Sequence, residues 1–126
     1  MTPSPVQFVA TEAATDESDG VIVTGVKRDN PDHYVMFQRT ATIGEDDDDP
    51  GPYIEYNDQI NAGTNNIESC RLQRQSLEIL LNDPIGNREK YSHFRISLAM
   101  PEEQWNSLAD GLRHVFSDCP GVLKID

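Results

Sequence analysis

The residues most able to do chemistry lie in one acidic stretch. Residues 45–49 read Glu-Asp-Asp-Asp-Asp and precede a Pro-Gly-Pro turn. Five adjacent carboxylates repel one another and cannot be buried, so they stay in water until a cation arrives. Such a run binds divalent ions weakly and lacks the ligand spacing and glycine of an EF-hand. The pattern therefore favours a solvated loop or a partner-facing patch over a metal site.

The histidines and cysteines match no familiar catalytic or metal-binding motif. His33, His93 and His114 are isolated in the sequence, and Cys70 and Cys119 do not form a CxxC pair, so we expect no metal ligands and two reduced thiols. A Cys119–His114 pair is geometrically conceivable, but we favour the interpretation of Cys119 as a plain thiol in a turn. We predict no catalytic residue, no metal and no cofactor, and hence a protein that is not an enzyme.

An aromatic side chain stands beside a carboxylate directly after the acidic run. In residues 53–57, Tyr-Ile-Glu-Tyr-Asn, the tyrosine at 53 and the glutamate at 55 share one face of a strand. Tyrosine is favoured in interfaces because it gives contact area at low entropic cost and keeps a polar tip. The alternative is an ordinary half-buried sheet tyrosine. The predicted partner-binding residues are Asp46, Asp47, Asp48, Asp49, Tyr53 and Glu55.

The negative charge is concentrated in the first half of the chain. Residues 1–63 contain thirteen Asp/Glu and three Lys/Arg, a balance of −10, whereas the balance of residues 64–126 is −2. Nucleic acids and anionic membranes would be repelled, so we exclude them as partners. A basic protein suits this charge, as does solubility alone. The partner hypothesis requires that the carboxylates are not already neutralised by arginines of the same fold.

Length and composition indicate one domain over residues 1–126, with a core at about 6–117 and an acidic loop at 44–52. Because only 37% of the residues are hydrophobic, we expect a thin core, with one sheet covered on one face. Residues 1–5 do not resemble a secretory leader, and no apolar run approaches the about 18 residues of a membrane span. We therefore expect a cytoplasmic protein.

Alternating apolar residues predict a series of short strands, while residues 11–19 and 58–66 are expected to be loops. Large side chains on both faces of residues 33–39 indicate a central strand covered above and below. A tail at 122–125 could add an edge strand. The expected strands are 6–9, 20–26, 33–39, 53–57, 67–74, 76–81 and 91–98.

One helix is expected to begin with Pro101 as its first residue and to end before residues 118–121. Its apolar stripe, at helical period, runs from Trp105 to Phe116, both expected to point inward. Short turns between consecutive strands imply antiparallel pairing. The expected fold is α+β: an antiparallel sheet of about six or seven strands with one C-terminal amphipathic helix packed on one face.

An ordered set of motifs resembles the immunity protein 10 family of bacterial polymorphic toxin systems, over about residues 6–117. The motifs are Val-Ile-Val-Thr-Gly at 21–25, Tyr-Val-Met-Phe-Gln-Arg at 34–39, an acidic insertion, Tyr-Ile-Glu-Tyr-Asn-Asp-Gln at 53–59, Gly63, a hairpin at 70–79 and the C-terminal helix.

The resemblance implies a small cytoplasmic, non-catalytic protein that binds and neutralises a toxin made by the same bacterium. The partner would be a cognate protein toxin with a basic surface, because acidic residues would speed its encounter with such a surface. On this hypothesis, neutralising residues 46–49 slows association with little change in thermal stability. The alternative hypothesis is a small-molecule-binding α+β domain that holds an apolar ligand between sheet and helix.

Overall fold

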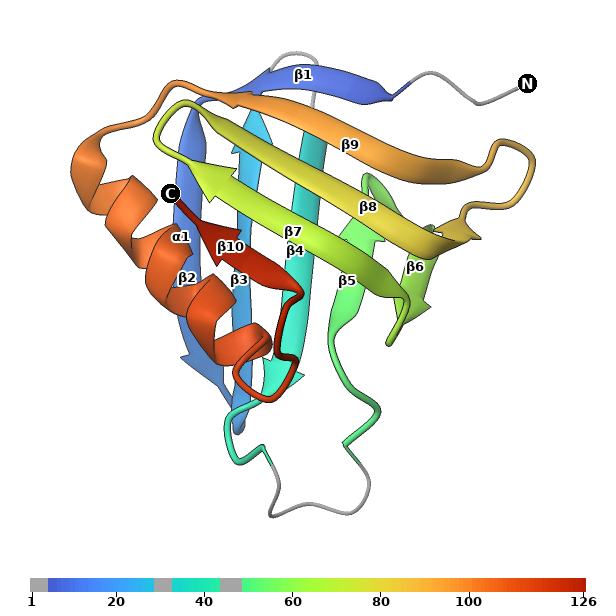
Figure 1. Ribbon diagram of the computed structural model, residues 1–126, viewed down its shortest axis with the longest axis horizontal. Coiled ribbons are helices and arrows are strands. Elements are labelled where there is room, and N and C mark those ends of the chain that lie inside the picture. The colour runs from blue at the N-terminus through green and yellow to red at the C-terminus, as the bar shows by residue number, and fades with distance from the viewer. Residues whose placement is uncertain (1–4, 29–32, 44–48) are drawn as a thin grey trace.

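The chain folds into two five-stranded sheets and one helix in a computed structural model, which describes residues 5–28, 33–43 and 49–126 (Figure 1). The α+β class is confirmed, but the expectation of a single sheet of six or seven strands is wrong. Alternation along a strand shows which residues face the core, and it does not show which strands pair. The two sheets place their apolar faces on one shared core, which is how a chain of modest apolar content supports both.

Sheet B is an antiparallel meander of five consecutive strands. The expected loop at 11–19 is mostly a strand, because Asp19 and Gly20 both take positive φ, 53° and 78°, and form a tight hairpin turn. The expected loop at 58–66 is likewise mostly a strand, paired with its predecessor across a β-bulge. The strands are β2 (Glu12–Ser18), β3 (Val21–Arg28), β4 (His33–Thr40), β5 (Tyr53–Tyr56) and β6 (Asp58–Thr64).

Sheet A has the strand order β1-β9-β8-β7-β10. Its centre is antiparallel and includes the expected hairpin, but both edge strands, β1 and β10, pair in parallel with their neighbours. The expectation of purely antiparallel pairing is therefore wrong at the two edges, where the partners are distant in sequence. The strands are β1 (Val6–Ala10), β7 (Ile67–Gln73), β8 (Ser76–Ile85), β9 (Tyr91–Leu98) and β10 (Leu123–Ile125).

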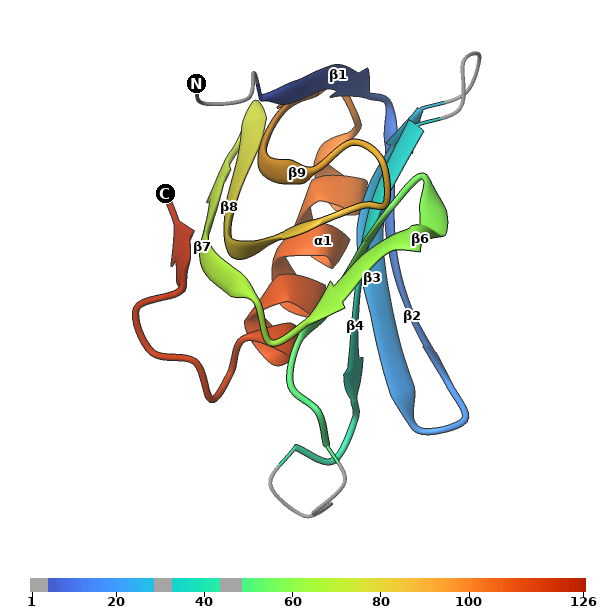
Figure 2. The ribbon, with the colours of Figure 1, turned by 90° about the vertical axis from the view of Figure 1, so that its right-hand side faces the viewer.

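Helix α1 (Glu102–Val115) lies on the inner side of sheet B, with sheet A on that same side (Figure 2). Pro101 caps the helix rather than being its first residue. Phe116 is buried as expected and meets the ring of Phe37 edge-on. Trp105 is only half-buried, and its indole N–H donates to the carbonyl of Gln73 at 2.9 Å. In the described part of the chain, no helix is both long and apolar enough to cross a membrane.

Helix and sheet meet directly at Gly111. A Cβ at this position would overlap Thr24 Oγ1 and would stand 2.5 Å from Thr15 Oγ1. The two threonine hydroxyls are 2.7 Å apart, and that of Thr15 donates to the carbonyl of Ser107 at 2.6 Å. At this contact, helix and sheet leave no room for the ligand that the alternative hypothesis places between them.

Candidate protein-binding face

Strands β4 and β5 place the predicted pair Tyr53 and Glu55 on the side of sheet B that faces away from the helix. Ile54 and Tyr56 point inward, where Tyr56 meets the ring of Phe94 in sheet A. Tyr53 and Glu55 therefore point outward, and Glu55 pairs in register with Met36 of β4. The prediction that the two side chains share one face of a strand is confirmed.

Glu55 lies between two tyrosines. Tyr53 Oη donates to Glu55 Oε1 at 2.6 Å, and Tyr34 Oη donates to Glu55 Oε2. Burial, reinforced by these hydrogen bonds and the negative charge of Glu55, raises the pKa of Tyr53 to about 12 and raises that of Tyr34 as well. Both phenols are thus held in the neutral, donating form. We call these three residues the tyrosine–glutamate cluster.

The carboxylate of the cluster is buried without a cation. Only 7% of Glu55 is exposed, and among the residues that the structure describes it forms no ion pair. A buried carboxylate ordinarily needs a positive partner or several donors, and here two phenols supply the donors. The cluster is therefore a negative centre just beneath an exposed sheet face. Sequence reasoning missed Tyr34, although its place in the two-sided strand 33–39 was a usable signal.

Small and aliphatic side chains continue this face across β2, β3 and β4. The register aligns Ala14, Gly25 and Met36 in one row. A Cβ at Gly25 would overlap the carbonyl oxygen of Val35, so glycine fits there without strain and a larger residue does not. A shallow hollow of about 470 Å³ lies there. We call the following residues the apolar patch of sheet B: Ala14, Val21, Val23, Gly25 and Met36.

The apolar patch corrects one interpretation of the sequence. Strand β4 is central in its sheet, as expected, and Val35 and Phe37 are fully buried on its inner face. Its outer face presents Tyr34 and Met36 beside the polar Gln38 and Thr40, and within the described residues no helix or strand packs on it (Figure 2). The large outward side chains of this strand are half-buried, and other elements of the described chain cover the strand on its inner face only, not above and below.

Asp49 ends the acidic run and is already paired. Its carboxylate receives hydrogen bonds from Arg39 Nε and Nη2 and lies 3.0 Å from Nη2. Their side chains are only 8% and 4% exposed. This pair occupies the carboxylate that the partner hypothesis needed free, so Asp49 has an internal role as a loop anchor. The remaining predicted contacts of the run, Asp46, Asp47 and Asp48, lie outside the described residues.

Arg39 joins three parts of the molecule. Besides Asp49, its guanidinium donates to the carbonyl of Val115 at the helix end and to both oxygens of Asp118 at 2.7 and 2.9 Å. The hydrogen bonds from Arg39 lower the pKa of Asp118 to about 2 and lower that of Asp49. Sequence reasoning missed this network, although an arginine within an apolar strand was a sign that it had partners.

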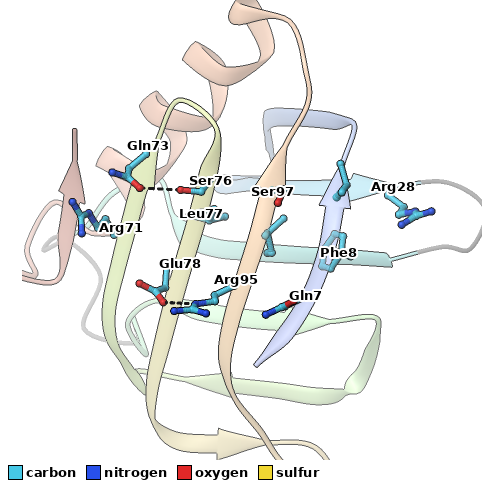
Figure 3. Close-up of a pocket in the computed structure, with 12 residues that line it drawn as sticks. Gln7, Phe8, Arg28, Arg71, Gln73, Ser76, Leu77, Glu78, Arg95 and Ser97 are labelled. Carbon is cyan, nitrogen blue, oxygen red and sulfur yellow. Dashed lines mark hydrogen bonds and ion pairs between the residues drawn. The ribbon is translucent and has the colours of Figure 1, made fainter. Parts of the chain in front are cut away.

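The outer face of sheet A has a different character (Figure 3). A hollow of about 540 Å³ there is lined largely by polar side chains. Arg95 Nε lies 3.2 Å from Glu78 Oε2, and Arg71 Nη2 lies 2.7 Å from Asp126 Oδ2. Apart from the exposed Val9, inward apolar and outward polar residues alternate as in an ordinary solvated antiparallel sheet. The charges of this face are largely matched within the fold.

Cys70, Cys119 and His114 do not come together as one site. His114 Nε2 donates to the carbonyl of Thr40, while the Cys119 thiol lies 3.3 Å from Asp118. Cys70 is fully buried, which raises its pKa to about 12. Neither cysteine forms a disulfide. Within the described residues, no three His, Cys, Asp or Glu side chains gather as a metal site would require.

The fold is thus a two-sheet α+β domain with one apolar, acid-bearing sheet face left exposed. The sequence matches the family described as Immunity protein 10 over residues 7–106, which is most of the chain. The chain belongs to the immunity protein 10 family, and the resemblance expected from its motifs is confirmed. No curated protein and no solved structure matches the chain.

Proposed function

We propose that this protein is a non-catalytic immunity protein that acts in the cytoplasm by binding and neutralising a cognate bacterial toxin. The observation that supports the proposal is the family match over residues 7–106. A toxin with a basic surface suits the acidic first half of the chain, because opposite charge steers the two proteins together. The same charge disfavours nucleic acids and anionic membranes as partners.

The contact surface that we propose includes Tyr53, Glu55 and residues 46–48. Two different grounds support this assignment. Tyr53 and Glu55 lie on an outer sheet face that no helix or strand covers among the described residues, and residues 46–48 are three consecutive aspartates in the sequence. Asp49 is also among the partner-binding residues predicted from the sequence. Because it pairs with Arg39, it is better suited to anchoring the end of the loop than to contacting a partner.

Co-expression with the toxin domain encoded beside its gene tests the proposed function. We expect the protein to restore growth of a host that expresses this toxin domain, and the purified pair to elute as one complex. Growth arrest despite abundant immunity protein, together with separate elution of the two proteins, would contradict the proposal. Rescue without a complex would point to an enzymatic or indirect mechanism instead.

A further inference from the structure

The two sheets of this molecule provide an internal comparison of exposed faces. On sheet A, most outward residues are polar, although Val9 is exposed there. Arg95 pairs with Glu78 (Figure 3), and Arg71 pairs with Asp126. On sheet B, the apolar patch stands where polar residues are the rule for a one-sided antiparallel sheet. An apolar patch that a protein leaves in water commonly marks an interaction site. The contrast singles out sheet B.

The hollow of the apolar patch has the shape of a receptor for a side chain. Ala14 and Gly25 are neighbours on adjacent strands, and together they leave a floor with almost no side-chain atoms. Met36 borders this floor, and its flexible thioether can adapt to a partner. An apolar side chain seated there would bury the side that contacts the sheet, and the rest of the partner's surface would cover it, which is how anchor residues gain binding energy.

The tyrosine–glutamate cluster lies directly beside this hollow. Met36 pairs in register with Glu55, so the hollow and the buried carboxylate are adjacent on one face. A basic side chain above the cluster would meet a negative charge that has no cation of its own among the described residues. It would also meet two tyrosine rings, whose faces attract cations. The cluster thus suits an arginine or a lysine.

Charge decides between the possible occupants of this face. A second copy of the chain would bring together two sheets from the half of the sequence with a balance of −10, and these would repel each other. A basic protein surface would be attracted. Resting on the proposed function, we propose that the toxin docks on the outer face of sheet B, with an apolar side chain in the hollow at Gly25 and a basic side chain over Glu55.

Two arginine substitutions with equal effect on net charge test this placement. Ala14→Arg alters the apolar patch, and Ser97→Arg is its control on the outer face of sheet A; both native residues are exposed strand residues. We expect Ala14→Arg to weaken binding of the neighbouring-gene toxin domain by about tenfold or more, since buried interface positions dominate affinity. Ser97→Arg should change the Kd by no more than about twofold, because substitutions at the rim of an interface or outside it have little effect on affinity.

Glu55→Gln tests the basic contact separately. It removes the charge while keeping the size of the side chain, and we expect about tenfold faster dissociation of the toxin complex, as for loss of one partner of a buried charge pair. Thermal melting of each free variant verifies that it is folded. Equal Kd values for the parent and Ala14→Arg, or equal weakening by Ser97→Arg, would overturn the placement on sheet B.

The controls separate this inference from the proposed function. If the parent binds the toxin domain but Ala14→Arg and Glu55→Gln bind it as tightly, the docking face is wrong and the proposed function stands. If the parent does not bind at all, both fail. Sedimentation of the free protein supplies a further test: a parent dimer that Ala14→Arg dissociates would make a second copy the occupant and would overturn the inference.

Discussion

At the residue scale, Glu55 determines how the neighbouring tyrosines ionise. Both Tyr34 and Tyr53 donate to its carboxylate, and their raised pKa values depend on burial and on this acceptor. Because the folded pKa of each phenol exceeds its ordinary value, the contribution to stability is present below about pH 10. It is lost as the pH rises through the folded value, which is about 12 for Tyr53.

In the Glu55→Gln variant, Tyr34 and Tyr53 should therefore ionise at a lower pH than in the parent. Removing the negative charge and the carboxylate acceptor lowers the pKa of Tyr34 and Tyr53, while burial keeps them above their ordinary value. Titration of the tyrosinate absorbance measures this shift. Glu89→Gln is the matched control, since Glu89 accepts from Tyr91 and raises its pKa. An identical curve for the parent and Glu55→Gln would contradict the hydrogen bonds of the cluster.

Asp49 and its acidic neighbours should differ in their effect on stability. Asp49→Asn removes a carboxylate from the buried guanidinium of Arg39, and we expect the free energy of unfolding to fall by about 1–3 kcal/mol. The triple variant Asp46→Asn, Asp47→Asn and Asp48→Asn should stay within about 0.5 kcal/mol of the parent, as surface changes do. Urea unfolding measures both, and a triple variant less stable than Asp49→Asn would contradict this division.

At the element scale, Arg39 fixes the end of the acidic loop and the end of α1 to strand β4. The pKa values of Asp49 and Asp118 are lowered by this arginine, so their stabilisation is complete above the ordinary carboxyl value near 4. It is lost as the pH falls through the folded value of about 2 for Asp118. The joint between the loop, helix and strand is therefore expected to weaken in strong acid.

The packing of α1 on sheet B depends on Gly111. Alanine favours helices by about 1 kcal/mol over glycine, but a Cβ at this position would overlap the hydroxyls of Thr15 and Thr24. We expect Gly111→Ala to lower the free energy of unfolding by about 1–3 kcal/mol, as overpacked cores do. Asn106→Ala, on the exposed side of α1, is the control and should be neutral or slightly stabilising. A more stable Gly111→Ala variant in thermal melting would contradict the close contact.

At the scale of the whole molecule, if the protein binds a toxin as proposed, the concentration of negative charge in the first half of the chain should govern the association rate. Neutralising residues 46–48 in the triple variant should slow association and flatten its dependence on salt, because steering acts over the distance that salt screens. Dissociation should change less, since it depends on the buried contacts. Stopped-flow mixing at several salt concentrations measures both rates. Equal association rates for the parent and the triple variant at low salt would remove the acidic run from the mechanism.

The sequence predicted single elements better than their assembly. Alternation identified the inward residues Leu72, Leu77 and Phe94, because side-chain direction is a local property of a strand. The split into two sheets and the parallel edges depend on contacts between distant segments, which no local pattern encodes. The Asp19-Gly20 turn was a local hairpin signal. It was overlooked because the residues before it are small and acidic, which favoured the prediction of a loop at 11–19.

The candidate site was predictable in part for the same reason. Tyr53 and Glu55 were found because two positions separated by one residue share a strand face. Tyr34 joins them only through the pairing of β4 with β5, and Asp49 meets Arg39 only after the loop has closed. Whether a carboxylate is free or paired is thus a property of the tertiary fold.

The arrangement of strands also has a consequence for synthesis on the ribosome. Every strand of sheet B pairs with its immediate neighbours along the chain. Its hairpins can therefore form while translation continues. Strand β1 must wait for β9, and β7 must wait for β10, which follows the helix. A newly made molecule would thus form sheet B early and complete sheet A later, when β1 and β10 join its two edges.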